Sequence, residues 1–142
     1  MTTTPVFDRT SDAALTPGVR YISSCGGTRS GKTWANLQVF YFLLLGEERR
    51  HAAPTVNSVV SESMPHLKRG AIRDFKAILA DEWDDNAWNK SESIYTFPSG
   101  SIIEFFSADQ PGKVHGPARD RLFINECQNI SYEVARQLFV RT

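Results

Sequence analysis

Residues 26–33 read Gly26-Gly27-Thr28-Arg29-Ser30-Gly31-Lys32-Thr33, which matches the pattern G-x-x-x-x-G-K-[S/T] at every fixed position. Loops of this pattern turn backbone N–H groups toward a triphosphate, and the helix that they open directs the positive end of its dipole at the same anion. In this pattern Lys32 contacts the β- and γ-phosphates, and the hydroxyl of Thr33 coordinates Mg²⁺. The run therefore predicts a site for a nucleoside triphosphate with Mg²⁺.

The segments on both sides of this run have the composition that the motif requires. The apolar stretch at residues 19–22 predicts a strand before the loop. Residues 34–45 are apolar on nearly every side and predict a buried helix that Gly46 ends. A glycine-rich turn that only caps a helix is the alternative, and the order of strand, loop and helix makes it the weaker interpretation.

The composition indicates one domain with a hydrophobic core, because 41% of the 142 residues are hydrophobic and 11% are aromatic. Sixteen basic and sixteen acidic side chains give a net charge of zero, so any contact with nucleic acid must come from a local patch. Cys25 and Cys127 form neither a disulfide scaffold nor a metal site, and we expect buried free thiols in a reducing compartment. The helix predicted after Thr33 is too short, and too polar at Asn36 and Gln38, to span a membrane, so no membrane partner is expected.

Strand and helix patterns alternate along the chain. Residues 1–17 are rich in Thr, Ser and Asp and predict an irregular arm, of which Val6 and Phe7 dock on the domain. A β-branched strand is predicted at residues 55–60. A hairpin is predicted at residues 94–106, with a glycine at the turn position that needs positive φ.

A helix is predicted to open at Pro65 and to run to residue 79. Its apolar face consists of Leu67, Ala71, Ile72, Phe75, Ile78 and Leu79. The other face is basic and carries Lys68, Arg69, Arg73 and Lys76. Such a face is able to follow a nucleic-acid backbone, and an ordinary solvated face explains the same residues as well.

A second chemical motif follows at Arg121-Leu122-Phe123-Ile124-Asn125-Glu126, an apolar strand that ends in two polar side chains. It resembles the second nucleotide motif of P-loop ATPases, in which an acid reaches the water shell of the metal and a following glutamate polarises the attacking water. Asn125 can accept a hydrogen bond from a Mg²⁺-bound water but brings no charge, so Glu126 has to supply the carboxylate. An ordinary buried strand with a polar end is the alternative, and the phosphate-loop pattern earlier in the chain disfavours it.

Three stretches, at residues 26–34, 59–71 and 116–130, resemble the ATPase part of the large terminase subunit of tailed bacteriophages, the motor that packs viral DNA. Asparagine and glutamate after Leu122-Phe123-Ile124 form a pattern associated with one branch of these terminases. The similarity runs from about Tyr21 to the last residue. It implies an α/β fold, the P-loop NTPase three-layer sandwich with a mostly parallel central sheet, over residues 18–142.

The resemblance also implies an activity and partners. The chain is expected to bind ATP and Mg²⁺ and to hydrolyse ATP while moving double-stranded viral DNA into a procapsid. The implied partners are the portal protein, the small terminase subunit and further copies of the chain in a ring, in the cytoplasm of the infected host. Two other hypotheses remain: a nucleotide-binding module without turnover, and another P-loop ATPase such as a helicase.

Several residue roles follow from the resemblance by position. Lys32 and Arg29 act on the phosphates within the ATP-binding run at residues 26–33, and Glu126 is the catalytic base. Thr33 and Asn125 lie around the metal, with Asn125 acting through a bound water. The candidate DNA contacts are Lys68, Arg69 and Arg73.

The arginine that acts across the terminase ring is harder to assign. His115 and Gly116 occupy its place, and Arg119 lies nearby, so His115 and Arg119 are the candidates for a trans-acting basic residue. Such an arginine is worth ~10³ to 10⁵ in rate.

Large terminases continue with a further core strand and a nuclease domain, and this chain stops at Thr142 before either. We therefore expect no DNA cleavage by this chain. In the family the further strand inserts between the two motif strands, so the sheet is expected to be incomplete at the C-terminus, with unpaired backbone groups beside the site.

Overall fold

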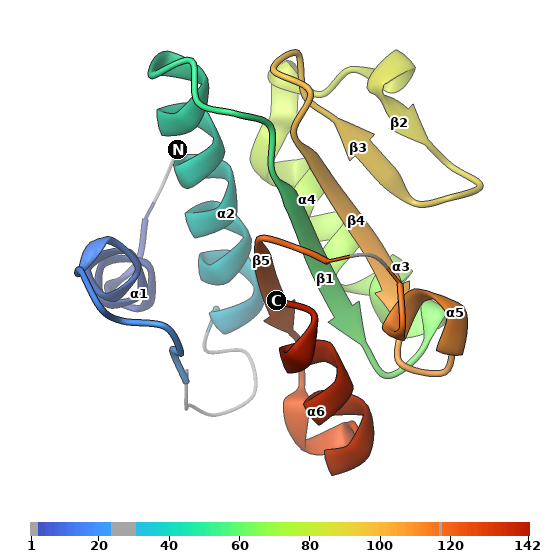
Figure 1. Ribbon diagram of the computed structural model, residues 1–142. Helices are drawn as coiled ribbons and strands as arrows, with labels where there is room; N and C mark the ends of the chain where they lie inside the picture. Colours follow the sequence, from blue (N-terminus) through green and yellow to red (C-terminus); the bar gives the residue numbers. More distant parts are fainter. Residues whose placement is uncertain (1–2, 24–30, 117) are drawn as a thin grey trace.

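A computed structural model describes residues 3–23, 31–116 and 118–142. Its centre is a five-stranded sheet in the order β2-β3-β4-β1-β5 (Figure 1). The strands are β1 (Val56–Ser61), β2 (Trp88–Asn89), β3 (Ile94–Thr96), β4 (Ile102–Ser107) and β5 (Arg121–Ile124). β1 is parallel to β4 and β5, whereas β3 is antiparallel to β2 and β4. The parallel core and the hairpin are thus confirmed, and Gly100 in the hairpin turn has φ 92°.

Helices cover both faces of this sheet, which confirms the predicted three layers (Figure 1). The helices are α1 (Pro5–Leu15), α2 (Lys32–Arg49), α3 (Met64–Arg69), α4 (Ala71–Leu79), α5 (Pro111–Val114) and α6 (Tyr132–Val140), with the 3-10 turns η1 (Ala80–Glu82), η2 (Asp85–Ala87) and η3 (Cys127–Asn129). Successive side chains of a strand point to opposite faces. Val59 accordingly packs with α2 and α4, and Val60 packs with α5 and α6. None of the described helices is long and apolar enough to cross a membrane.

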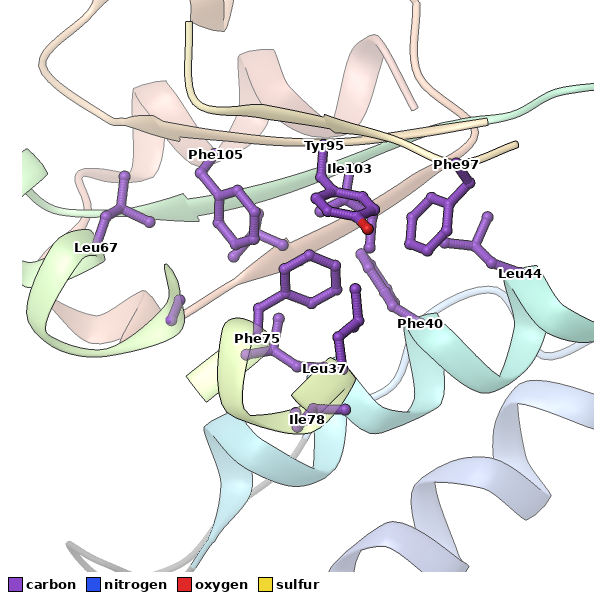
Figure 2. Packing of buried hydrophobic residues seen from close by; sticks show 13 residues of the cluster. Leu37, Phe40, Leu44, Leu67, Phe75, Ile78, Tyr95, Phe97, Ile103 and Phe105 are labelled. Carbon is purple, nitrogen blue, oxygen red and sulfur yellow. The ribbon is translucent and has the colours of Figure 1, made fainter. Parts of the chain in front are cut away.

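The larger core cluster surrounds Phe75 of α4 (Figure 2). Its ring centroid lies 5.5 Å from that of Phe105 and 5.7 Å from that of Tyr95, which both belong to the sheet. Leu37 and Phe40 of α2 point into the same cluster. Burying side chains of this size contributes roughly 1.5–3 kcal/mol each, so the cluster holds α2 and α4 firmly on one face of the sheet.

The helix predicted from Pro65 to residue 79 is divided into α3 and α4. The break lies at Gly70, whose φ of −112° and ψ of −92° are not helical. A Cβ atom at this position would lie 3.0 Å from the carbonyl oxygen of His66, so any other residue would crowd this tight junction. The predicted apolar face is confirmed, because its residues on both helices pack in or against the larger cluster.

The helix after the phosphate loop does not end at Gly46 as predicted but continues to Arg49. The extra turn contains Glu47, which is 7% exposed and forms an ion pair with Arg121 of β5. Oε2 of Glu47 also accepts a hydrogen bond from Oγ1 of Thr55 over 3.2 Å. Because these contacts tie the end of α2 to the sheet, tertiary structure outweighs the low helix propensity of glycine.

The N-terminal arm, predicted to be irregular, contains helix α1. Oγ1 of Thr4 caps this helix by accepting a hydrogen bond from the N–H of Phe7 over 3.3 Å, and Pro5 occupies the first turn. Phe7 is 9% exposed and packs with Val6 against α2, which confirms the predicted docking of these two residues. They were predicted to be the only docking residues of the arm, which is wrong, because Ala14 packs against the same cluster.

The strand predicted at residues 19–22 is not formed. These residues pair with no strand, and Val19, Tyr21 and Ile22 are 43%, 67% and 43% exposed. A short apolar stretch becomes a strand only when a neighbour satisfies its backbone groups. Within the described ranges β5 pairs with β1 alone, so β5 is the edge strand on the side where unpaired backbone groups were predicted.

Candidate functional site

The two chemical motifs meet at the carboxyl edge of the parallel strands. Thr33 is the second residue of α2, and its Oγ1 donates a hydrogen bond to Oδ1 of Asn125 over 2.8 Å. Asn125 directly follows β5, and its backbone N–H donates to the carbonyl of Val60 over 2.8 Å, which extends the pairing of β5 with β1. The phosphate-loop motif and the second motif therefore converge although these two residues are 92 positions apart.

The start of α2 has a backbone suited to an anion. Gly31, at the N-cap, has φ 79°, in the left-handed region that glycine adopts without strain, and it brings no side chain to cap the first turn. Its carbonyl accepts a hydrogen bond from the N–H of Ala35 over 2.9 Å, so the helix is regular from its first turn. Lys32 is the first of the 18 residues of α2, at the positive end of the helix dipole.

Glu126 is exposed and has a left-handed backbone, with φ 55° and ψ 54°. This conformation costs a non-glycine residue roughly 1–3 kcal/mol and is concentrated at functional sites. The N–H of Asn129 donates to the carbonyl of Glu126 over 2.9 Å, and Nε2 of Gln128 donates to its carboxylate. Glu126 directly follows Asn125 in the chain, and its carboxylate is held by Gln128, a partner that the sequence pattern did not indicate.

Ser61 is a second residue at this edge that the sequence analysis missed. Nδ2 of Asn125 donates a hydrogen bond to Oγ of Ser61 over 3.4 Å. Ser61 is the last residue of β1 and is 1% exposed. The available signal was a serine at the end of an apolar strand, because the carboxyl ends of neighbouring parallel strands meet where α/β folds bind ligands.

Arg119 is buried, which argues against the trans-acting role predicted for it. It is 5% exposed, and its Nε donates to Oγ of Ser58 over 3.1 Å. Its terminal nitrogens donate to the carbonyls of Leu138 and Lys113 over 3.1 Å and 3.4 Å. Burial lowers the pKa of the Arg119 guanidinium, and the charge of Glu104 raises it. A group that reaches a neighbouring subunit must be exposed, so Arg119 is a structural residue.

His115, the other trans-acting candidate, is exposed at the end of α5. It lines a pocket of about 230 Å³ together with Arg136, Gln137, Val140 and Arg141. This pocket lies among residues of α5 and α6, on the face of the sheet opposite α2. The structure therefore does not bring His115 to Thr33 and Asn125 of its own chain.

The candidate DNA-contacting residues are exposed but do not share one helix. Lys68 and Arg69 belong to α3, Arg73 belongs to α4, and the break at Gly70 separates them. Nη2 of Arg73 lies 3.6 Å from the carboxylate of Asp74. Burial raises the pKa of Asp74, whereas the charge of Arg73 lowers it. The contact of these basic side chains with nucleic acid stays a prediction.

Part of the phosphate-loop prediction lies outside the described residues, namely Gly26, Gly27, Thr28, Arg29 and Ser30. The catalytic role of Arg29 therefore stays a prediction. Cys25 also lies outside this part of the chain. Cys127 is a free and exposed cysteine, so the prediction of a buried thiol is wrong at this position.

The polar groups at the edge of β1 and β5 fit Mg²⁺. Two oxygen atoms, Oγ1 of Thr33 and Oδ1 of Asn125, lie 2.8 Å apart at the start of α2. Mg²⁺ prefers oxygen ligands and keeps several waters, so one hydroxyl with a nearby neutral acceptor suits a cation whose other ligands are phosphates and water.

Comparison with known proteins gives a family and a fold. The family described as "Terminase large subunit, T4likevirus-type, N-terminal" matches residues 24–142. The structure of the large terminase from a thermophilic bacteriophage, in its second crystal form, is similar, with a TM-score of 0.68 and 15% identity over 82% of this chain and 29% of that chain. The complex of that terminase with ATP-γ-S has a TM-score of 0.62, with 15% identity over 82% of this chain and 28% of that chain. Its complex with ADP has a TM-score of 0.61, with 17% identity over 82% and 29%.

These structural matches establish the fold alone, because the identities are low. The chain spans less than a third of the length of the terminase structures that it matches. No curated protein sequence matches the chain.

Proposed function

Because this chain belongs to the family of the N-terminal part of T4-like terminase large subunits, we propose that residues 18–142 form an ATP-hydrolysing motor domain that packages double-stranded viral DNA into a procapsid. The hydrogen bond between Thr33 and Asn125 carries the proposal, because it joins the two nucleotide motifs at one edge of the sheet. A large terminase of similar fold has been solved with ATP-γ-S and with ADP, which supports ATP as the ligand. Family membership gives no support to the alternative of a helicase.

The residues of the site have separate tasks in this mechanism. The run at residues 26–33 binds the triphosphate, with Lys32 and Arg29 on the β- and γ-phosphates. Thr33 and Asn125 would hold Mg²⁺, Thr33 through its hydroxyl and Asn125 through a bound water. Bound Mg²⁺ supplies neutralisation of the charge that develops on the phosphates. Glu126 orients the attacking water and accepts its proton as the bond from the water oxygen to the γ-phosphorus forms. The bond from that phosphorus to the bridging oxygen breaks, and ADP leaves with the electron pair.

The motor function involves parts beyond these residues. We include in the proposal a ring of several copies, the portal protein, the small terminase subunit and double-stranded DNA, in the cytoplasm of the infected host. Lys68, Arg69 and Arg73 are the proposed DNA contacts, and His115 is the proposed basic residue at a neighbouring subunit. DNA cleavage is not part of the proposal.

Replacing the lysine of the phosphate loop tests nucleotide binding. Lys32→Ala is expected to weaken ATP binding about ten- to a hundredfold, because a hydrogen bond to a charged group is worth about 1.5–3 kcal/mol. Isothermal titration with ATP and Mg²⁺ measures the change. Lys90→Ala, at an exposed lysine between β2 and β3, is the matched control and should bind as the unchanged chain does. Equal affinity of the two variants would place the triphosphate elsewhere.

Restoring a charge next to the metal tests the role of Asn125. Asn125→Asp is expected to lower the Mg²⁺ concentration that half-saturates nucleotide binding by about fivefold or more, since two opposite unit charges at 4 Å attract by about 1 kcal/mol even in bulk water. A titration of Mg²⁺ at fixed ATP measures it. An unchanged Mg²⁺ requirement would place this side chain outside the water shell of the metal.

One observation favours a second function, that of a nucleotide-binding module without turnover. The position that meets Thr33 is Asn125, which brings no charge to the cation. Tight binding of ATP without release of phosphate over many hours would support this alternative.

A further inference from the structure

We propose that Ser61 is a positioning residue that sets the orientation of the Asn125 amide, so that its oxygen and not its nitrogen faces Thr33 and the cation. The inference rests on the proposed function, because it concerns the Mg²⁺ that accompanies the nucleotide. An aspartate in place of Asn125 would need no such neighbour, because both ends of a carboxylate are oxygens.

An asparagine at this position has two unlike ends. Its Oδ1 accepts hydrogen bonds, whereas its Nδ2 only donates them. A half-turn of the amide therefore exchanges an acceptor for a donor, and Nδ2 can neither bind a cation nor accept from a metal-bound water. A carboxylate presents an oxygen in both orientations. With Asn125, the site works only when a neighbour favours one orientation.

The fold places Ser61 where it can act on this amide. Phe123 packs with the cluster of α2 and Ile124 with that of α6, so alternation along β5 puts Asn125 on the α2 face. The same alternation along β1, from Val59 and Val60, puts Ser61 on that face. Ser61 is also rigidly held, because its carbonyl accepts the N–H of Ala108 over 2.8 Å and the residue is 1% exposed.

The hydroxyls of Thr33 and Ser61 have different hydrogen-bonding roles toward Asn125 once a cation is present. Oγ1 of Thr33 binds the cation through a lone pair, and its hydrogen then has to be donated to Oδ1 of Asn125 over 2.8 Å. Nδ2 is thereby directed to Oγ of Ser61, the acceptor at 3.4 Å. Without the Ser61 hydroxyl, Nδ2 of Asn125 loses this acceptor when Oδ1 faces Thr33. Because the contact is only partly buried, the cost lies at the low end of the range for an unsatisfied polar group.

The experiment is a double-mutant cycle on the complete chain, with Ser61→Ala, Asn125→Asp and the two together. Isothermal titration measures the affinity for an ATP analogue that is hydrolysed slowly, once with Mg²⁺ and once with EDTA. In the chain with Asn125, Ser61→Ala is expected to weaken Mg²⁺-dependent binding about three- to tenfold. Combined with Asn125→Asp, the same serine substitution is expected to change it less than about twofold. Binding in EDTA should not change in either background.

Ser107→Ala is the matched control. Ser107 is fully buried at the end of the neighbouring strand β4 and pairs in register with Ser61, but its hydroxyl donates to Asp109. Ser107→Ala should not change the Mg²⁺-dependent affinity, either in the chain with Asn125 or in the Asn125→Asp variant. Ser61→Cys, which keeps the volume with a weaker acceptor, should give an intermediate effect and replaces Ser61→Ala if that variant does not fold.

Two outcomes would overturn the inference in distinguishable ways. An equal loss from Ser61→Ala in both backgrounds, or an equal loss in EDTA, would make Ser61 a residue of general stability and leave the proposed function intact. No Mg²⁺-dependent binding by the unchanged chain would overturn the proposed function, and the role of Ser61 with it.

Discussion

Glu126→Gln is expected to lower the steady-state rate of ATP hydrolysis about a hundred- to ten-thousandfold, the range for a positioned general base. The amide cannot take the proton of the attacking water, whereas its shape and its place after Asn125 are kept. The Kd for ATP should stay within about twofold, because Glu126 is proposed to contact the attacking water and not the phosphates. Phosphate release from the purified chain and titration with ATP provide the two measurements.

Glu133→Gln is the matched control for this result. Glu133 is exposed on α6 and, like Glu126, its carboxylate accepts a hydrogen bond from a glutamine amide, that of Gln137 over 3.0 Å. Its replacement should leave the rate unchanged. If Glu126→Gln hydrolyses ATP as fast as an active unchanged chain, the catalytic assignment of Glu126 is wrong.

Arg119→Met is expected to reduce the free energy of unfolding by about 1–3 kcal/mol, as removing a buried group that hydrogen-bonds three partners does. Methionine fills much of the volume but satisfies neither the carbonyl of Leu138 nor that of Lys113. It also leaves Ser58, whose hydroxyl donates to Glu104 over 2.6 Å, without the neighbouring guanidinium. Urea unfolding followed by circular dichroism measures the loss.

Arg136→Met tests whether the loss comes from burial and not from removing any arginine. Arg136 is exposed on α6 and lies 3.7 Å from Glu133, a surface pair worth at most about 1 kcal/mol. A small change is therefore expected. Arg119→Met could instead unfold at the same urea concentration as the unchanged chain and stop hydrolysis in an assembled ring. That result would show that Arg119 acts on a neighbouring subunit and is not needed for stability.

Much of the fold was predictable because short patterns determine its elements. The β-branched composition of β1, the turn at Gly100 and the apolar helix after Thr33 follow from residues only a few positions apart. The errors arose where distant partners intervene. Residues 19–22 have strand composition but no pairing neighbour, and α2 passes Gly46 because Glu47 is tied to the sheet.

The candidate site was predictable in outline. The run ending at Thr33 and the pair Asn125-Glu126 were each recognisable as a local motif, and the direction of parallel strands places their ends at one edge. Ser61 was marked only by its place at the end of an apolar strand, and Gln128 has no pattern of its own. Their importance comes from a contact with a motif residue.

The sequence by itself determined the class of fold and was enough to predict a nucleotide ligand, since a phosphate loop and an apolar strand are properties of adjacent residues. Only the tertiary structure decided what Arg119 does and which group meets the Asn125 amide. The physical reason is that a buried polar group takes its partners from whichever elements pack around it. For Arg119 and Asn125, the partners Ser58 and Ser61 lie 61 and 64 residues away along the chain.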